Sequence, residues 1–138
     1  MSKIRTTLAT FIALTLATTL TSTGTAAAAS PWPKPVVTIA DTLHCKHRVS
    51  SADGEGGTGL SCTVTTKTGK RQRYVILRHA DTQHGIDWWR WFIDDGGYFA
   101  HRGHVLIIPV GTRRTPAYTE KWARWAVARV DGARLIKG

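Results

Sequence analysis

Acidic residues are scarce in this chain. It contains nine Asp and Glu against nineteen Lys and Arg, which gives its 138 residues a formal net charge of +10. A glycoside hydrolase needs two carboxyl groups that converge on one bond. The adjacent pair Asp94 and Asp95 would point to opposite faces of a strand, so the sequence argues against this class of enzyme.

Signatures of several other enzyme classes are also missing. The glycine-rich segment 50–59 is not followed by the Lys-Ser/Thr pair of a phosphate-binding loop, and Ser61 lacks the flanking glycines of a serine hydrolase. Six histidines are present, but basic residues stand between closely spaced pairs such as His101 and His104 and would repel a cation. We therefore expect no metal site and no cofactor.

A long, fully apolar run is missing as well. Residues 1–29 begin with Lys3 and Arg5, continue with an uncharged apolar and threonine stretch, and end in four alanines. This order predicts a cleaved secretory signal peptide. The alternative is a membrane anchor, but Thr, Ser, Gly and Ala fill the second half of the segment. We expect a secreted protein, extracellular or associated with the cell envelope, with no stable membrane anchor after cleavage.

Cysteine is limited to two residues, Cys45 and Cys62. In an exported protein an even number of cysteines favours a disulfide. The bond would close a loop around the glycine-rich segment and stabilise the fold by about 3 kcal/mol. The alternative is a nucleophilic Cys45 assisted by His44 or His47, which flank it.

One small domain follows the predicted leader. Removal of residues 1–29 leaves 109 residues with a net charge of +8, enough for a single domain with a modest core. Residues 30–35 alternate proline with other residues, which predicts an extended arm. Residues 36–138 contain no internal repeat and no linker, so we expect one α+β domain there.

Most of the predicted structure is a sheet. The clearest element is a β-hairpin, in which 60–66 and 71–79 flank a short turn and Val75 and Leu77 share one face. Further strands are expected at 36–40, 43–49, 105–110 and 134–136, with Pro109 indicating a sheet edge or a strand exit.

Two tryptophan-rich segments complete the prediction. Segment 88–93 fits a strand or a helix, and its aromatic and β-branched content favours a strand. Thr115 and Pro116 begin a helix whose apolar face holds Trp122 and Trp125. The expected fold class is α+β: a mostly antiparallel sheet with one C-terminal amphipathic helix and one disulfide.

Histidines and arginines at predicted strand ends form a catalytic hypothesis. The candidates are His79, His84, His101 and His104 together with Arg78 and Arg102. Two histidines can act as general base and general acid in metal-free RNA cleavage, while arginine stabilises the charge on phosphorus. The alternative is a basic strand end that faces water.

Basic and aromatic residues form a separate binding hypothesis. The candidates are Arg71 and Arg73 on the hairpin and Trp88 and Arg90 in the aromatic segment. Exposed aromatic and arginine side chains stack on sugars or bases, and a positive surface attracts nucleic acid or anionic cell-wall polymers. This surface would disappear if the sheet were covered on both faces.

These observations favour a secreted, basic, tryptophan-rich domain that binds an anionic polymer or a glycan at or beyond the cell envelope. One alternative is a secreted, metal-independent ribonuclease or toxin-like enzyme that uses the histidines and arginines. Another is a module that binds a protein partner, such as an inhibitor, through residues 50–59. The sequence does not specify the ligand or the oligomeric state.

Overall fold

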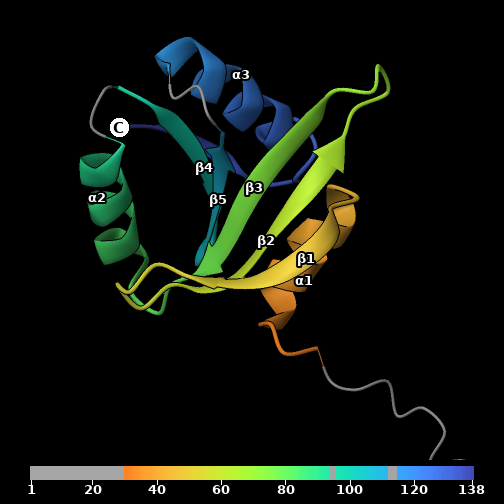
Figure 1. Ribbon diagram of the computed structural model, residues 1–138. Helices are drawn as coiled ribbons and strands as arrows, with labels where there is room; N and C mark the ends of the chain where they lie inside the picture. Colours follow the sequence, from red (N-terminus) through yellow and green to blue (C-terminus); the bar gives the residue numbers. More distant parts are fainter. Residues whose placement is uncertain (1–29, 94–95, 112–114) are drawn as a thin grey trace, which may run out of the picture.

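The computed structural model describes residues 30–93, 96–111 and 115–138, and the predicted signal peptide lies outside them. The described chain folds into six strands and three helices (Figure 1). In chain order these are α1 (Lys34–Thr42), β1 (Lys46–Ala52), β2 (Thr58–Thr65), β3 (Arg71–Arg78), α2 (Thr82–Phe92), β4 (Tyr98–Arg102), β5 (Val105–Val110), α3 (Pro116–Val127) and β6 (Arg134–Lys137). The strands form one antiparallel sheet in the order β1-β2-β3-β5-β4-β6. The α+β class and the C-terminal helix are confirmed.

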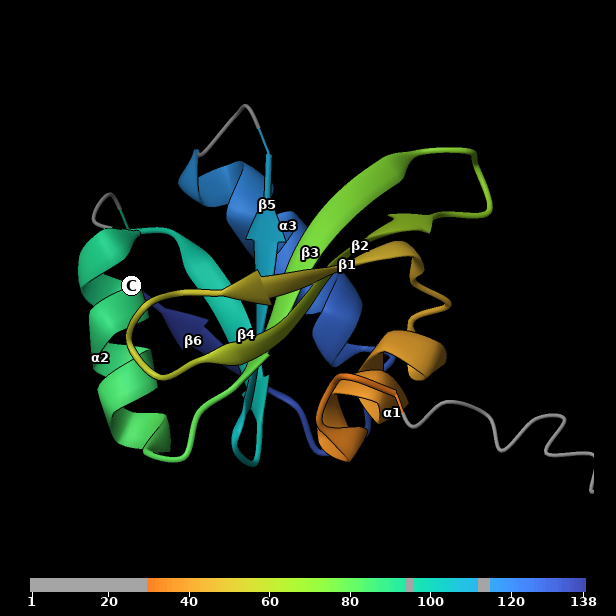
Figure 2. The ribbon, with the colours of Figure 1, turned by 60° about the horizontal axis from the view of Figure 1, so that its bottom comes forward.

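The helices are divided between the two faces of the sheet (Figures 1 and 2). Helices α1 and α3 pack on one face, where Ile39 and Trp122 join the inward side chains of β2 and β3. Helix α2 packs on the other face through Ile86 and Trp89, which contact a second core built on Leu106. The sheet therefore separates two hydrophobic cores.

The hairpin of β2 and β3 is confirmed. Its antiparallel register is unbroken from the first residue pair to the last. Strand alternation places Tyr74 and Ile76 in the core under α1 and α3. Leu77 belongs to the core under α2, and Val75 packs against that core. Val75 and Leu77 thus share one face, as the sequence predicts.

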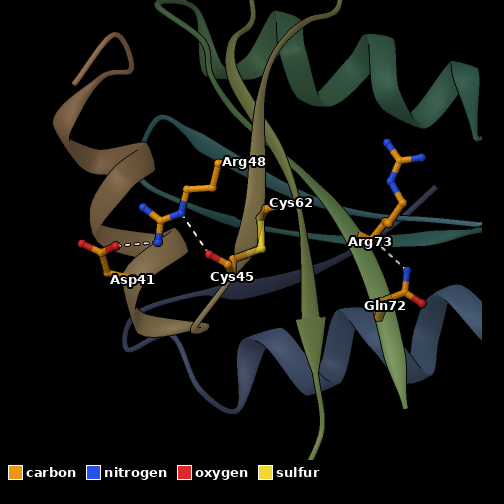
Figure 3. The surroundings of a disulfide bond; sticks show 6 residues. All are labelled: Asp41, Cys45, Arg48, Cys62, Gln72 and Arg73. Atoms are coloured by element: carbon orange, nitrogen blue, oxygen red, sulfur yellow. Dashed lines mark hydrogen bonds and ion pairs between the residues drawn. A yellow bond between two sulfur atoms is a disulfide. The ribbon is translucent and has the colours of Figure 1, made fainter. Parts of the chain in front are cut away.

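The predicted disulfide between Cys45 and Cys62 is present (Figure 3). Both residues are buried in the core under α1 and α3. The bond attaches the segment that leaves α1 to the middle of β2. Beside it, Arg48 donates to the carbonyl of Cys45 and forms an ion pair of 2.6 Å with Asp41 of α1. The N-terminal helix is therefore fastened to the sheet by a covalent bond and a polar contact.

The first strand expected from the sequence is a helix. Residues 36–40 lie in α1, so the strand prediction is wrong. The helix begins at Lys34, inside the arm predicted for residues 30–35, and the chain bends at Pro31 and Trp32. Pro35 stands in the first helical turn, where its missing N–H costs nothing. Val36 and Ile39, one turn apart, bury one face of the helix. The β-branched side chains of this segment suggest a strand, but its buried residues recur at helical spacing, and the segment forms a helix.

The aromatic segment 88–93 is also helical through Phe92, so the preference for a strand is wrong there too. Asp81 caps α2, because its side chain accepts a hydrogen bond of 3.0 Å from the N–H of His84. Ile86 and Trp89 then face the sheet at helical spacing. The aspartates expected to form a turn after this segment, Asp94 and Asp95, lie outside the described residues.

Strand β5 lies inside the sheet, between β3 and β4. Of the two interpretations of Pro109, a sheet edge is therefore wrong, whereas a strand exit agrees with its position one residue before the end of β5. At Pro109 the strand pairs with Tyr74 of β3, whereas its pairing with β4 extends only as far as Ile107. Proline has no N–H to donate, but because β4 does not pair with β5 at this residue, no carbonyl of β4 loses a hydrogen bond.

Other boundaries differ by a few residues. β1 begins at Lys46 and continues through Ala52, so only 53–57 of the predicted glycine-rich loop connects it to β2. β4 was not predicted. Helix α3 begins as expected, because Thr115 accepts a hydrogen bond from the N–H of Tyr118, and β6 forms at the expected place.

We predict that reduction of the Cys45–Cys62 disulfide lowers the free energy of unfolding by about 3 kcal/mol, because the bond restricts the unfolded chain across a separation of 17 residues. Urea unfolding of oxidised protein and of the Cys45→Ser/Cys62→Ser variant measures the difference. The Asp41→Asn variant, which removes the neighbouring exposed ion pair, is the control and should change stability by less than about 1 kcal/mol. Equal stability of oxidised protein and double variant would contradict the prediction.

Candidate functional site

A buried carboxylate joins three segments of the chain. The Asp53 side chain, in the connection after β1, is 1% exposed, and its Oδ2 lies 2.7 Å from Nε2 of His79 at the end of β3. The same oxygen accepts a hydrogen bond of 3.0 Å from the indole N–H of Trp89 in α2. Oδ1 accepts from the backbone N–H groups of Glu55 and Gly57. We refer to Asp53, His79 and Trp89 as the Asp53 network.

The imidazole of His79 is enclosed between two glycines. A Cβ atom at Gly57 would stand 2.4 Å from its Nε2, and one at Gly85 would stand 2.6 Å from its Cγ. The close 2.7 Å approach to Asp53 is not aligned as a directed hydrogen bond, so the contact is mainly electrostatic. His79 is 1% exposed, and in this position the ring does not reach a ligand outside the protein.

The ionised form of Asp53 is stabilised by its neighbours. Burial by itself would raise the pKa of this carboxyl, but the N–H groups of Glu55 and Gly57, the indole of Trp89 and charge on His79 together hold the pKa below its ordinary value. Each carboxylate oxygen has partners, so the charge is buried without an unsatisfied acceptor. The arrangement holds the 53–57 connection against α2.

Three of the four predicted catalytic histidines lie around the first turn of α2. His84 is exposed, and its Nε2 lies 3.0 Å from Oε2 of Glu55. His104 is also exposed, and its Nδ1 lies 2.5 Å from Oγ1 of Thr82. The backbone N–H of His79 donates to the carbonyl of His104. The backbone therefore brings these histidines to one end of the sheet, with two imidazoles at the surface and one buried.

The predicted arginines do not share this face of the sheet. Arg78 and Arg102 both pair with Val105, whose side chain belongs to the core under α1 and α3. The alternation along each strand sends His79 and His101 to the α2 side instead. His101 is half-buried on β4, and its Nδ1 is buried without a hydrogen-bond partner among the described residues. The side chains of the two histidines and the two arginines therefore project from opposite faces of the sheet.

Basic side chains gather around the tip of the β2–β3 hairpin. This hairpin basic cluster consists of Lys67, Lys70, Arg71, Arg73 and Lys121, all exposed. None of the ion pairs between described residues involves any of the five. The sequence predicts Arg71 and Arg73 as binding residues. It also shows Lys67 and Lys70 beside them, but gives no signal that Lys121 of α3 joins them.

Like charges are crowded in this cluster. Lys121 and Lys70 lie close enough for the charge and the side-chain contact of Lys70 to lower the pKa of Lys121. Arg73 leaves β3 on the side opposite Gln72, whose amide is buried against α3 (Figure 3). The cluster therefore presents positive charge on both sides of the hairpin tip.

Aromatic side chains lie along the exposed side of α2. Trp88 stacks on Phe92 with ring centroids 5.1 Å apart, and Trp91 is 73% exposed. Trp88 also packs against the same core as Val75 of β3. Arg90, predicted to act with Trp88, instead donates a hydrogen bond to the carbonyl of residue 137. Its guanidinium is therefore held toward β6 and away from the hairpin.

The α2 side of β1, β2 and β3 is partly exposed. Figure 2 shows α2 on the side of the sheet that holds β4 and β6, with the connection between β1 and β2 reaching across to it. Val49 is 62% exposed there, and Ser61 opposite it is half-buried. Arg71 and Arg73 emerge on this side. The described helices thus leave a sheet face uncovered between the aromatic side of α2 and the hairpin tip.

Comparison with protein-family models, curated proteins and solved structures finds no match for this chain. Within residues 30–93, 96–111 and 115–138, no three His, Cys, Asp or Glu side chains lie close enough to hold a metal ion. No helix in that part of the chain is long and apolar enough to cross a membrane. The arrangement of the side chains described above is therefore the basis for a functional proposal.

We predict that Gly85→Ala destabilises the protein by about 1–3 kcal/mol, because the new methyl group would overlap the ring of His79. At an unobstructed position inside a helix the same exchange stabilises a protein by up to about 1 kcal/mol, so the sign of the change is diagnostic. Chemical unfolding measures it, with Gln83→Ala, on the exposed side of the same turn, as the control. Increased stability of Gly85→Ala would contradict the enclosed position of His79.

We predict that Asp53→Asn lowers the free energy of unfolding at neutral pH by about 2 kcal/mol, because it removes a buried, hydrogen-bonded charge. The folded pKa of Asp53 lies below its unfolded value of 3.8. The stabilisation is therefore complete above that value and is lost as the pH falls through the folded pKa. Urea unfolding of both proteins between pH 7 and pH 2 should show the difference narrowing in acid. A constant difference would contradict the assignment.

Proposed function

We propose that this protein binds a polymer of repeated phosphodiester groups through the hairpin basic cluster. Nucleic acids and phosphate-linked cell-wall polymers share this chemistry. The observation that carries the proposal is the crowding of five exposed cations, two of them close enough for one to lower the pKa of the other, without an acidic partner among the described residues. Unpaired like charges repel one another, so a polyanion that neutralises them is bound favourably.

The open sheet face supports the same proposal. Arg71 and Arg73 leave β3 on this face, and the stacked rings of Trp88 and Phe92 belong to α2, which packs on the same face of the sheet. Cationic side chains hold a phosphate backbone, while aromatic rings accept bases or sugar rings by stacking. Together with the secretory leader predicted for residues 1–29, this supports a binding role at or beyond the cell envelope.

The exposed pair of His84 and Glu55 favours cleavage of RNA as a second candidate function. A carboxylate and an imidazole 3.0 Å apart are groups that can exchange protons with a substrate. They lie at the end of β3 farther from the hairpin basic cluster, so a bound polymer would have to extend along the open sheet face to reach them. A binding protein without catalysis needs neither group.

We predict that binding to duplex DNA weakens steeply with salt, with a log–log slope of about −0.9 for each neutralised phosphate. Replacing Arg71, Arg73 and Lys121 by Gln should flatten this slope. Fluorescence anisotropy at several salt concentrations measures it, and a phosphate-linked cell-wall polymer added as competitor compares the two sources of phosphodiester.

The control variant replaces Lys34, Arg134 and Lys137 by Gln and removes the same charge away from the hairpin, so it should retain most of the slope. Equal slopes for the two triple variants, or no binding at low salt, would overturn the proposal. The second candidate function, RNA cleavage, is tested by incubating RNA with the protein in the presence of EDTA. If the protein cleaves RNA, and if Glu55→Gln and His84→Ala slow the cleavage by about 10²-fold or more, the protein is an enzyme. If the RNA stays intact, binding is the only function that remains proposed.

A further inference from the structure

A cleft of about 330 Å³ lies where the N-terminal arm passes the ends of β1 and β2. It is lined by Pro31, Trp32, Pro33, Ser50, Ser51, Ala52, Thr58 and Gly59. Its volume falls within the range of clefts that hold small ligands. The cleft lies beside the first residues of β2, whereas the hairpin basic cluster surrounds the turn after its last residues. The two sites are therefore at opposite ends of the same strand.

The chemistry of the lining is unlike that of the rest of the surface. No lining residue has an ionisable side chain, although the chain carries a net charge of +10. The side-chain hydroxyls on the same face of the sheet as Trp32 are instead those of Ser50 and Thr58. Such a lining provides neither a countercharge for an ionic ligand nor a fully apolar wall. It suits a neutral ligand that has both an apolar face and hydroxyl groups.

The indole of Trp32 gives this cleft a fixed aromatic wall. Its Nε1 donates a hydrogen bond of 3.1 Å to Oγ of Ser50, and part of the ring packs against the core under α1 and α3. These contacts set the ring before any ligand arrives, so little side-chain freedom is lost on binding. Pro31 and Pro33, on either side of Trp32, restrict the backbone that carries it.

We propose that the Trp32 cleft binds a neutral pyranose unit of a glycan. One face of a pyranose ring consists largely of C–H groups and stacks on the indole, while its hydroxyls exchange hydrogen bonds with Ser50 and Thr58. This inference does not depend on the proposed function, because it concerns another surface and an uncharged ligand. A protein with both sites would hold a glycan and a phosphodiester chain at once.

The position of the cleft favours a sugar over an extended peptide. β1 is an edge strand, and a peptide added to the sheet would lie along its free edge. The lining residues instead come from both β1 and β2 as well as the arm, so the cleft spans the ends of two strands. A cleft formed by three segments and confined to the strand ends suits a single ring better than an extended strand.

Titration calorimetry with two neutral trisaccharides, of N-acetylglucosamine and of glucose, tests the proposal. We expect at least one to bind, with an affinity that is insensitive to salt. Trp32→Ala should weaken that binding by about tenfold, the loss expected for one aromatic contact. Trp91→Ala is the matched control, because it removes an exposed tryptophan from α2 and should leave the affinity unchanged.

A second variant is needed because Trp32→Ala could weaken binding by unfolding the protein. Ala52→Phe adds a ring at an exposed position in the cleft without removing a core contact, and it should also weaken sugar binding by about tenfold while circular dichroism stays unchanged. Failure of both trisaccharides to bind the wild-type protein, or binding that both variants retain, would overturn the proposal. Binding of a neutral extended peptide in place of the sugars, with the same sensitivity to Ala52→Phe, would overturn it in favour of a protein partner. Loss of DNA binding alone would overturn the proposed function and leave the sugar site intact.

Discussion

The buried carboxylate of Asp53 is the contact on which the arrangement of this fold depends. It connects the turn between β1 and β2, the end of β3 and the inner side of α2, although Trp89 lies 36 residues further along the chain. An ionised group can be buried only if its partners replace water, and here three N–H groups and the charge on His79 do so. This contact holds the 53–57 connection against α2, which also packs on the sheet through Ile86 and Trp89.

The distribution of acidic residues then explains where the free positive charge lies. Asp41 and Glu120 pair with arginines of the helices and β1, and Asp53 and Glu55 pair with histidines beside the first turn of α2. None of these four acidic side chains forms an ion pair at the hairpin tip. Because oppositely charged partners are placed elsewhere, the cations of the hairpin basic cluster act on solvent and ligands with little internal compensation. The asymmetry is a property of the whole fold as well as of the hairpin sequence.

Local patterns in the sequence suffice for the hairpin, the C-terminal helix and the disulfide. Alternation in β3, the Thr115–Pro116 start of α3 and a pair of cysteines are each readable within a few residues. The first two helices are misread because valines in α1 and tryptophans in α2 favour strands when burial is ignored. In both helices, the residues one turn apart that face the sheet decide the outcome.

The candidate site was predicted only in part, for a related physical reason. Arg71, Arg73 and Trp88 stand in recognisable basic and aromatic runs, but the arginines lie near the hairpin tip and Trp88 belongs to α2. Asp53 and Lys121 act through neighbours that are distant in sequence, so no local pattern identifies them. The glycines at 57 and 85 suggest flexibility, yet each provides space for the ring of His79. Whether a glycine serves mobility or close packing is decided by what faces it.

The pairing of β3 with β5 has a consequence for how the chain acquires its structure. This ladder joins an N-terminal part, α1 to β3, to a C-terminal part, α2 to β6, and each part contains strands linked by short turns. Hairpins close quickly, whereas strands separated by a helix and another strand must first lose the entropy of a long loop. We therefore expect the two halves to form early and their central ladder to set the folding rate. The same ladder would then be the last to form and the place where an incompletely folded chain exposes unpaired strand edges.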